Sequence, residues 1–405
     1  MKSVRDYGAA GNGKKDELSI LQTAIEKEKE LFFPQGTYIV SDTLKVPSDR
    51  KLVFEKGAVL KLKAATKRKR GDFLLTNKNT ETGDKNITII GATFDGNNGY
   101  KNHKRPKNIF QKDGYSGVLI NFRNVKNLTL KDLTLQNPVA YYTRFCQIDG
   151  FLIEDITLKS NKEMPNQDGI HFAGEVRNGV VRNITAATYG QTNDDLLAIN
   201  ADDYPGRIEE FDTVCGPIEN VLFENISAES CHDGIRLLSF VSVIRNLTFR
   251  NLNIGFRKCA VECNAARGCR AELFKEKDHP NGVGRLENIR FEDCTFFHTI
   301  DLPYHWKGSR GDIPHPLILW GSLSNNVSFE DCKFISAPFV RFDPFSNFIN
   351  KIKRKTCNEN SFPKFMIKNV TNQIVIQGQN KYEIIKKEDS KKLSDITDLT
   401  INTLN

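Results

Sequence analysis

A short motif repeats along most of the chain and limits the folds that the chain can adopt. Each copy is a short strand with alternating apolar residues, then Asn or Asp, then a second short strand. The copies are NLTLKDLTL, FLIEDITLKS, GVVRNITAAT, VLFENISAES, NLTFRNLNI, NIRFEDCTFF and NVSFEDCKFI. The shared Asn or Asp falls at Asp132, Asp155, Asn183, Asn225, Asn251, Asp293 and Asp331. Its spacing is 23 to 28 residues, stretched to about 40 where a loop is inserted.

Alternation with a period of two indicates strands, and Asn or Asp tolerates the left-handed bend of a tight corner. One coil of two or three strands cannot bury its own apolar face. Coils stacked about 4.8 Å apart bury a continuous core. A sandwich of hairpins would need turns such as Asn-Gly between the strands of each copy, and these segments lack them. The repeat therefore predicts an all-β chain folded as a parallel β-helix, a solenoid.

The N-terminal segment has a different period. Residues 17–30, ELSILQTAIEKEKE, place Leu18, Leu21, Ala24 and Ile25 on one face of a helix. Because the open end of a solenoid exposes apolar surface, we expect this helix to cap it. We expect one β-helix domain over residues 1–385, with its cap region in 1–45, followed by a polar C-terminal tail at 386–405.

The charge of the chain suggests a class of partner. The formal net charge is +8, and the densest basic runs are KLKAATKRKRGD at 61–72 and YKNHKRPKNIFQK at 100–112. Such runs are either solvated loops or a field that concentrates an anionic ligand. Nucleic acid fits poorly, since no basic helix, zinc finger or RNA-binding aromatic signature accompanies the charge. An acidic polysaccharide or oligosaccharide fits the charge and needs no such module.

Other features narrow the class of protein further. No run of 18 apolar residues exists, so we expect no membrane partner. The first residues, MKSVRDYGAAG, lack the apolar core of a signal peptide. We expect a secreted or periplasmic protein whose leader was removed, with a cytoplasmic one still open. The odd count of nine cysteines argues against a disulfide scaffold. Cys294 and Cys332 occupy the same place in two copies and are predicted to be buried.

Ionisable residues follow three successive corners. After Asp155 comes NQDGIHF, after Asn183 comes NDDLLAI, and after Asn225 comes CHDGIRL. Counting from the corners, Asp168, the pair Asp194 and Asp195, and the pair His232 and Asp233 are predicted to lie at nearly one place on one sheet. An Asp or Asn ladder at coil corners is the structural alternative. Four acids, a histidine and an arginine (Arg236) in one column favour chemistry over a ladder.

Crowded carboxylates raise one another's pKa, so one can stay protonated near neutral pH while another is ionised. Hydrolysis of a glycosidic bond needs this combination, an acid for the leaving oxygen and a base for water. The column therefore predicts a glycoside hydrolase.

At these residues the chain resembles the family 28 glycoside hydrolases, the polygalacturonase family of the pectin-lyase-like right-handed β-helix superfamily. The resemblance runs over about residues 3 to 340. It rests on NQD, NDDLLAIN and CHDGIRLLS, where the family has Asn-Thr-Asp, Asp-Asp and Gly-His-Gly. The entry segment VRDYGAAGNGKKDELSILQTAIE and the stretch NITIIGATFDGNN are also similar. It departs at the family's Arg-Ile-Lys, for which GFRKCAVEC offers only Arg257 and Lys258.

The resemblance implies a right-handed helix and an inverting hydrolase acting on an acidic, pectic or galacturonan-like polymer. It implies Asp194 as general acid, Asp168 with Asp195 as the bases that activate water, and His232 as the residue that tunes the acid. No cofactor and no metal are expected. The remaining expected site residues bind substrate: Arg236, which would pair with a uronate carboxylate, Asn166, His171, Asp233, Arg257 and Lys258.

Two other functions stay open. A polysaccharide lyase on the same fold would hold Ca²⁺ with Asp168, Asp194 and Asp195 and use Arg236 as base. A non-catalytic β-helix, such as a tailspike-like module that binds carbohydrate, would need no acid column. The sequence does not indicate an oligomeric state.

Overall fold

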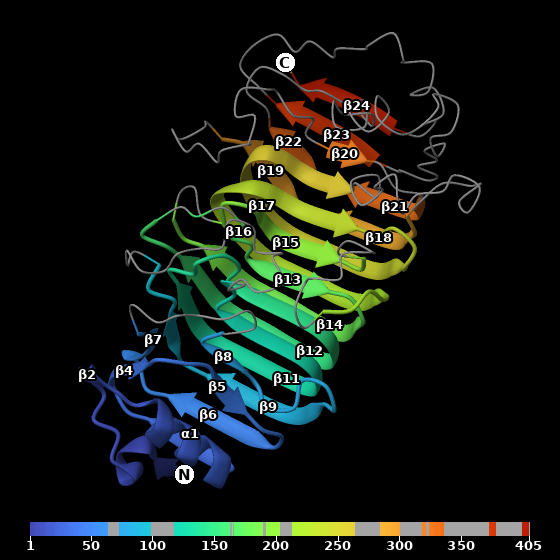
Figure 1. Ribbon diagram of the computed structural model, residues 1–405. Coiled ribbons are helices and arrows are strands. Elements are labelled where there is room, and N and C mark those ends of the chain that lie inside the picture. Colours follow the sequence, from blue (N-terminus) through green and yellow to red (C-terminus); the bar gives the residue numbers. More distant parts are fainter. Residues whose placement is uncertain are drawn as a thin grey trace, which may run out of the picture.

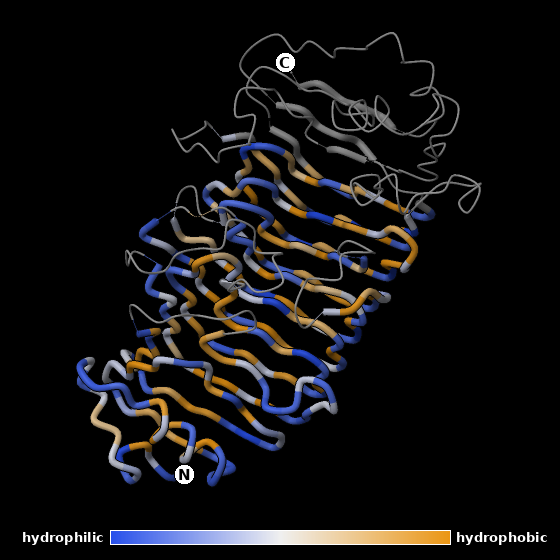
Figure 2. The backbone as a smooth tube through the Cα atoms, viewed as in Figure 1, coloured by the Kyte–Doolittle hydropathy of each residue, from blue (hydrophilic) through white to orange (hydrophobic). Residues whose placement is uncertain are grey.

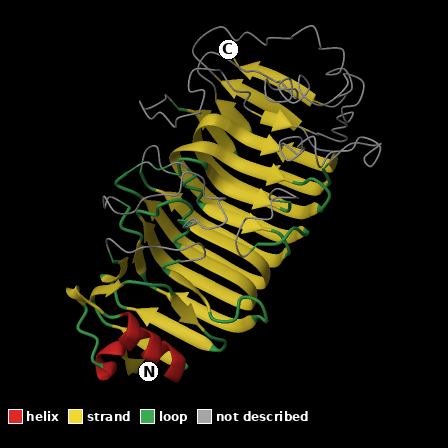
Figure 3. Cartoon of the chain, in the orientation of Figure 1, coloured by secondary structure: helices red, strands yellow, loops and turns green. Residues whose placement is uncertain are grey.

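The computed structural model describes residues 1–63, 73–98, 117–162, 164, 166–188, 192–202, 213–263, 284–299, 318–320, 324–335, 372–377 and 399–404. Over these residues the chain is a right-handed parallel β-helix, and the predicted fold class is confirmed. Figure 1 shows the coils stacked along one axis, and Figure 3 shows strands throughout, with helical structure at the N-terminal end.

The elements up to residue 95 are short. They are β1 (Lys2–Ser3), the 3-10 helix η1 (Val4–Tyr7), β2 (Asn12–Asp16), α1 (Leu18–Lys27), β3 (Glu30–Phe33), β4 (Gly36–Val40), β5 (Leu44–Val46), β6 (Arg50–Phe54), β7 (Ala58–Leu62), β8 (Leu75–Asn77), β9 (Asp84–Ile90) and β10 (Thr93–Asp95).

Several later strands are long because they continue around corners. They are β11 (Ile120–Gln136), β12 (Thr143–Lys159), β13 (Ile170–Ala173), β14 (Val176–Ala186), β15 (Asp195–Asn200), β16 (Ile218–Leu238), β17 (Ile244–Cys263), β18 (Leu286–Glu292), β19 (Thr295–His298), β20 (Ile318–Trp320), β21 (Ser324–Glu330), β22 (Lys333–Ile335), β23 (Asn372–Gln377) and β24 (Leu399–Leu404).

Parallel pairing between coils builds three stacks of strands. The first stack runs through β3, β6 and β9 into the middle of β11, and ends at β18 and β21. The second runs through β4, β7 and β10 and ends at β19 and β22 to β24. The third stack joins β5 and β8 to the start of β11 and β12, then β13, β15, the ends of β16 and β17, and β20. The third stack carries the predicted site.

The predicted corners are confirmed by the backbone. All seven shared Asn or Asp residues of the repeat have a positive φ, between 52° and 57°. Their side chains also bond from coil to coil: Asn183 donates to Asp155 at 2.8 Å, Asn225 to Asn183 at 3.2 Å and Asn251 to Asn225 at 2.7 Å. The short polar side chain thus supplies both the left-handed bend and a contact along the axis.

The core is a continuous apolar column inside the coils. Phe223, Phe249, Phe291 and Phe329 stack in successive coils with ring centroids 4.8, 4.8 and 4.4 Å apart. The predicted burial of Cys294 and Cys332 is confirmed, since both are at most 1% exposed. Figure 2 shows hydrophobic and hydrophilic residues alternating along the coils, as period-two strands require.

Opposite charges alternate along the outside of the first stack. The residues in register are Lys131, Glu154, Arg182, Glu224, Arg250 and Glu292. Glu154 accepts from both Lys131 and Arg182, and Arg250 pairs with Glu224 and Glu292. Because a coil shifted by one position would break these contacts, the column helps to set the register.

The predicted capping helix is confirmed as α1. Leu21, Ala24 and Ile25 are fully buried, and Leu18 packs partly buried against the same core. Arg50 of β6 donates to the carbonyls of Ile25 and Glu26 near the end of the helix. The helix covers the apolar end of the first coil (Figure 1).

Some predictions are not decided by the described residues. The domain boundary at 385 and 386 lies outside them. The basic runs also lie largely outside, since residues 64–72 and 99–116 are not described. Within the described part of the chain, no helix is both long and apolar enough to cross a membrane.

Candidate active site

The third stack brings the predicted acids together. β13 and β15 pair with Ile170 opposite Leu197, and β15 and β16 pair with Asp195 opposite Asp233. Asp168 therefore lies one coil from Asp195, and the amide of Gly169 donates to the Asp195 carbonyl at 2.9 Å. The predicted column of Asp168, Asp195 and Asp233 on three successive coils is confirmed by this register.

The strand that follows the Asp pair explains why two acids stand at its start. Leu197 and Ile199 of β15 are fully buried in the apolar core, so they fix the strand firmly in the coil. Asp195 is the first residue of β15 and is 2% exposed. Asp194 comes just before the strand, and its side chain keeps 15% of its surface exposed. The pair therefore contains one buried carboxyl and one that solvent reaches.

Asp168 is held by a histidine on its own coil. The Asp168 Oδ2 lies 2.7 Å from His171 Nδ1, and the His171 ring stacks on Tyr141 with centroids 4.5 Å apart. Burial, together with the charge of Asp194, raises the pKa of Asp168 to about 6, against the opposing effect of His171. His171 is 1% exposed, so in this conformation it supports Asp168 rather than facing an open groove.

Asp195 pairs with the next coil. Arg236 of β16 places Nη1 3.6 Å from Asp195 Oδ2, and the arginine side chain is 9% exposed. Burial, with the charges of Asp194, Asp168 and Asp233, raises the pKa of Asp195 well above its ordinary value, although Arg236 opposes this. Near neutral pH the two buried carboxyls Asp168 and Asp195 thus share a tendency to keep protons that an isolated aspartate lacks.

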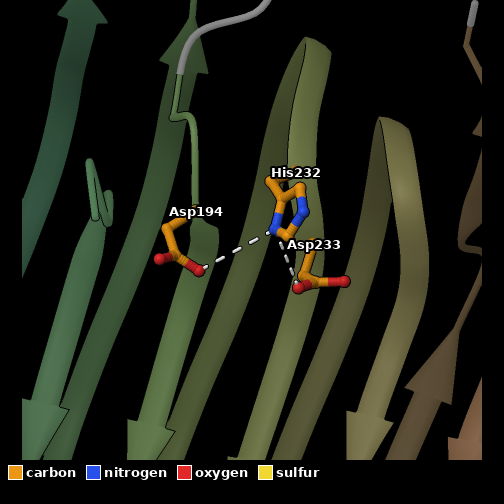
Figure 4. Close-up of side chains that lie close together, drawn as sticks. All are labelled: Asp194, His232 and Asp233. Atoms are coloured by element: carbon orange, nitrogen blue, oxygen red, sulfur yellow. Dashed lines mark ion pairs between the residues drawn. The ribbon is translucent and has the colours of Figure 1, made fainter. Parts of the chain in front are cut away.

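Asp194 is surrounded by two polar side chains. Asn166 donates from Nδ2 to Asp194 Oδ2 at 3.1 Å, and His232 Nδ1 lies 3.9 Å from Asp194 Oδ1. Figure 4 shows the His232 ring between Asp194 and Asp233, with its Nδ1 side turned to both carboxylates. The same ring nitrogen is 3.2 Å from Asp233 Oδ2. Asn166 and His232 thus orient the most exposed of the three predicted catalytic acids.

Asp233 differs from the other buried acids because a lysine neutralises it. Lys258 of β17 places Nζ 2.9 Å from Asp233 Oδ2, and the Cys259 amide donates to Asp233 Oδ1 at 2.9 Å. Burial acts to raise the pKa of Asp233, but the charges of Lys258 and His232 outweigh it and hold the pKa well below its ordinary value. Asp233 is therefore ionised across the whole range in which the protein would work.

The predicted substrate-binding cations are all engaged within the protein. Arg236 faces Asp195, and Arg257 donates to the Asn193 side chain at 2.6 Å and to the Cys231 carbonyl at 3.3 Å. Lys258 contacts both Asp233 and Glu262. A role of these residues in binding a uronate stays a prediction, and it would require the substrate to compete with these partners.

Sequence reasoning missed Glu262 and Asn193. Glu262 is 2% exposed, lies opposite Arg236 in register, and accepts a hydrogen bond from Lys258. Its signal in the sequence is one acid inside the apolar run CAVEC, a position that only a buried partner can stabilise. Asn193 stands directly before the Asp pair and fixes Arg257.

Two groups of side chains in the described residues have donor atoms close enough to suit a metal. They are Asp194 with His232 and Asp233, and Asp233 with Cys259 and Glu262. The ammonium of Lys258 already contacts Asp233 and Glu262, so a cation of the protein itself compensates the second group. Neither group includes Asp168 or Asp195, which the calcium-dependent alternative requires.

The fold and this cluster define a class: a right-handed parallel β-helix with an acidic site on the outside of one stack of strands. Comparison with known proteins then identifies the family. The family model described as "Rhamnogalacturonase A/epimerase, pectate lyase-like" matches residues 1–258, and the chain belongs to this family. The matched range ends at Lys258 and so includes every predicted site residue. The resemblance to the polygalacturonase family is confirmed.

Individual relatives fall into two kinds. The endo-polygalacturonase of Pectobacterium carotovorum subsp. carotovorum is 26% identical over 319 residues, which are 70% of this chain and 74% of that protein. The preneck appendage protein of Bacillus phage PZA is 38% identical over 98 residues, 24% of this chain and 11% of that protein. The chain thus spans only about a tenth of the length of the phage protein.

A solved structure supports the fold. The family 28 exopolygalacturonase of Yersinia enterocolitica superposes with a TM-score of 0.52 and 18% identity, covering 82% of this chain and 65% of that one. At this level of identity the likeness shows the β-helix and nothing finer.

Proposed function

We propose that this chain is an inverting glycoside hydrolase that cleaves an acidic, pectic or galacturonan-like polysaccharide. The observation that carries the proposal is the acid column. Two buried carboxyls with raised pKa values, Asp168 and Asp195, lie beside a third carboxyl, Asp194, that solvent reaches. Glycosidic cleavage needs a proton for the leaving oxygen and a base for water within one small site.

In the proposed mechanism Asp194 protonates the leaving oxygen, since it is the acid that a polymer can approach from outside. Asp168 and Asp195 act together on the attacking water. They share protons as a coupled pair, and Asp168 becomes available as a base as the pH rises through about 6. His232 lies 3.9 Å from Asp194 and adjusts its protonation.

The charge of the chain supports an acidic substrate. The net charge of +8 and the basic runs at 61–72 and 100–112 would attract a polyanion at low ionic strength. The expected compartment follows from the substrate: a polymer of this class lies outside the cytoplasm, so we propose a secreted or periplasmic protein.

Product analysis tests the proposal. The chain is incubated with polygalacturonan, rhamnogalacturonan and neutral glycans, and reducing ends are measured together with absorbance at about 235 nm. New reducing ends without absorbance support hydrolysis, whereas absorbance identifies a lyase that forms an unsaturated product. Proton NMR of the first product shows whether the anomeric configuration is inverted. Retention would overturn the assigned roles of the acids.

The similarity to a phage appendage protein favours a second candidate, a β-helix that binds carbohydrate without cleaving it. Binding to a glycan with no reducing ends released would support this function. An equal affinity of Asp194→Asn and the wild type, with no turnover by either protein, would settle it.

A further inference from the structure

We propose that Lys258 and Asp233 are positioning residues that hold the His232 imidazole against Asp194. The inference rests on the proposed function, because it gives these two residues a part in the same acid chemistry. Sequence reasoning predicts both as substrate-binding residues, and their contacts favour this other role.

The contacts form a continuous chain across three coils. Lys258 of β17 reaches Asp233 of β16 at 2.9 Å, and Asp233 Oδ2 lies 3.2 Å from His232 Nδ1. That ring nitrogen is 3.9 Å from Asp194 Oδ1, on the coil before (Figure 4). Asp233 is 1% exposed, so a substrate cannot reach it in this conformation.

The backbone fixes both ends of this chain. The His232 amide donates to the Thr192 carbonyl at 3.1 Å, and the Asp233 amide to the Asp194 carbonyl at 3.3 Å. The second oxygen of Asp233 accepts from the Cys259 amide at 2.9 Å. Because both carboxylate oxygens are occupied, Asp233 has one orientation, and that orientation presents Oδ2 to the imidazole.

Lys258 supplies the only ammonium group among the described neighbours of Asp233. Other titratable and charged groups face Asp233 from all sides, and they are Asp194 and Asp195 on the preceding coil, His232, Cys231 and Arg236 on its own strand, and Cys259 and Glu262 on the following coil. Asp194, Asp195 and Glu262 are acids that would favour a proton on Asp233. The Lys258 ammonium, bound to Asp233 and Glu262 together, opposes them.

The consequence for pH dependence has a definite sign. In the wild type the pKa of Asp233 is held well below its ordinary value, so Asp233 stays ionised in acid. Without the Lys258 charge, burial raises the pKa of Asp233 and leaves its negative charge unmatched beside Asp195. Both effects make protons harder to remove from the cluster. The acid limb of kcat/KM should therefore move to higher pH in Lys258→Met.

The test compares Lys258→Met, Lys258→Arg and Asp233→Asn with the wild type on a cleaved substrate. We expect the acid limb of Lys258→Met to move up, with about tenfold loss of kcat/KM in acid for each pH unit moved. Lys258→Arg should restore the profile. Asp233→Asn should lower kcat more than about tenfold with little change in KM, whereas a residue that binds substrate equally in ground and transition states would raise KM.

Lys131→Met is the matched control. Lys131 also bridges to a carboxylate of the adjacent coil, with Nζ 2.7 Å from Glu154 Oε1, but it lies on the first stack. Its pH profile should match the wild type. An unmoved acid limb in Lys258→Met, or a rise in KM alone, would overturn the proposal.

A second measurement needs no activity. In protein with ¹³C-labelled aspartate carboxyls, the resonance missing from Asp233→Asn identifies Asp233. It should show no titration in the wild type down to the acid limit of folding, titrate in Lys258→Met, and stop titrating again in Lys258→Arg. If no glycan is cleaved, the proposed function fails while this titration still decides the link. Identical titration in the three proteins would refute the link itself.

Discussion

Asp168→Asn should make the protein more stable near neutral pH while removing its activity. The pKa of Asp168 rises from its ordinary 3.8 to about 6 because the carboxyl is buried. At about 1.36 kcal/mol per pH unit, this difference of about 2.2 corresponds to about 3 kcal/mol. That free energy is the extra cost of holding the ionised carboxylate in the folded chain.

The sign follows from proton linkage. Below pH 3.8 the carboxyl is protonated in both states, and its ionisation costs nothing. Between 3.8 and about 6 the unfolded chain releases the proton and the folded chain keeps it, so stability falls as pH rises. Above about 6 the full cost remains. Asn does not titrate, so the stability of the variant relative to the wild type should increase by about 3 kcal/mol from pH 3.5 to pH 7.5.

Urea unfolding at these two pH values measures the difference. Asp155→Asn is the control for the chemical change, because Asp155 is a partly exposed corner residue that bonds Asn183. Its stability relative to the wild type should change little with pH. A pH-independent effect of Asp168→Asn, or a loss of stability that grows with pH, would refute the assignment of a strained buried carboxylate.

Four further outcomes are expected. Asp194→Asn should lose about 10²–10⁴-fold activity on polysaccharide but less on aryl glycosides with good leaving groups, whereas Asp195→Asn should lose activity on both; equal effects would refute separate roles. kcat/KM should rise with pH through about 6, where Asp168 ionises. Arg236→Lys should weaken binding of a uronan by about 1–3 kcal/mol, measured by calorimetry, and unchanged affinity would exclude a uronate contact. Phe249→Ala should destabilise the fold by about 3–5 kcal/mol in urea, because it interrupts the ring stack between Phe223 and Phe291.

The repeat predicts most of the fold because corner and strand are local properties. Each Asn or Asp at a corner specifies its own positive φ, and each strand specifies its inward face by alternation. Register between coils follows from these two, and Asp233 lies opposite Cys259, each eight residues past its corner at Asn225 or Asn251. Counting alone fails for Asp168 and Asp195, 13 and 12 residues past theirs, where loops of unequal length intervene.

The pairing of charges within the site could not be predicted in this way. Register places Arg236 beside Glu262, yet its guanidinium lies near Asp195 on the preceding coil. Long side chains reach one coil in either direction, so their partner depends on burial and on the competing charges. Glu262 takes Lys258 instead, and both choices appear only when all three coils are in place.

Two columns of charge in this one chain follow opposite rules. On the first stack, opposite signs alternate from Lys131 to Glu292, which stabilises neighbours about 4.8 Å apart. On the third stack, Asp168, Asp195 and Asp233 follow one another with the same sign, and the pKa values of two of them are raised as a result of burial and mutual repulsion. Alternation on the first stack shows that the same register accommodates opposite charges, so the fold does not require three adjacent acids. The stability lost there is better explained by the chemistry of the site than by the construction of the helix.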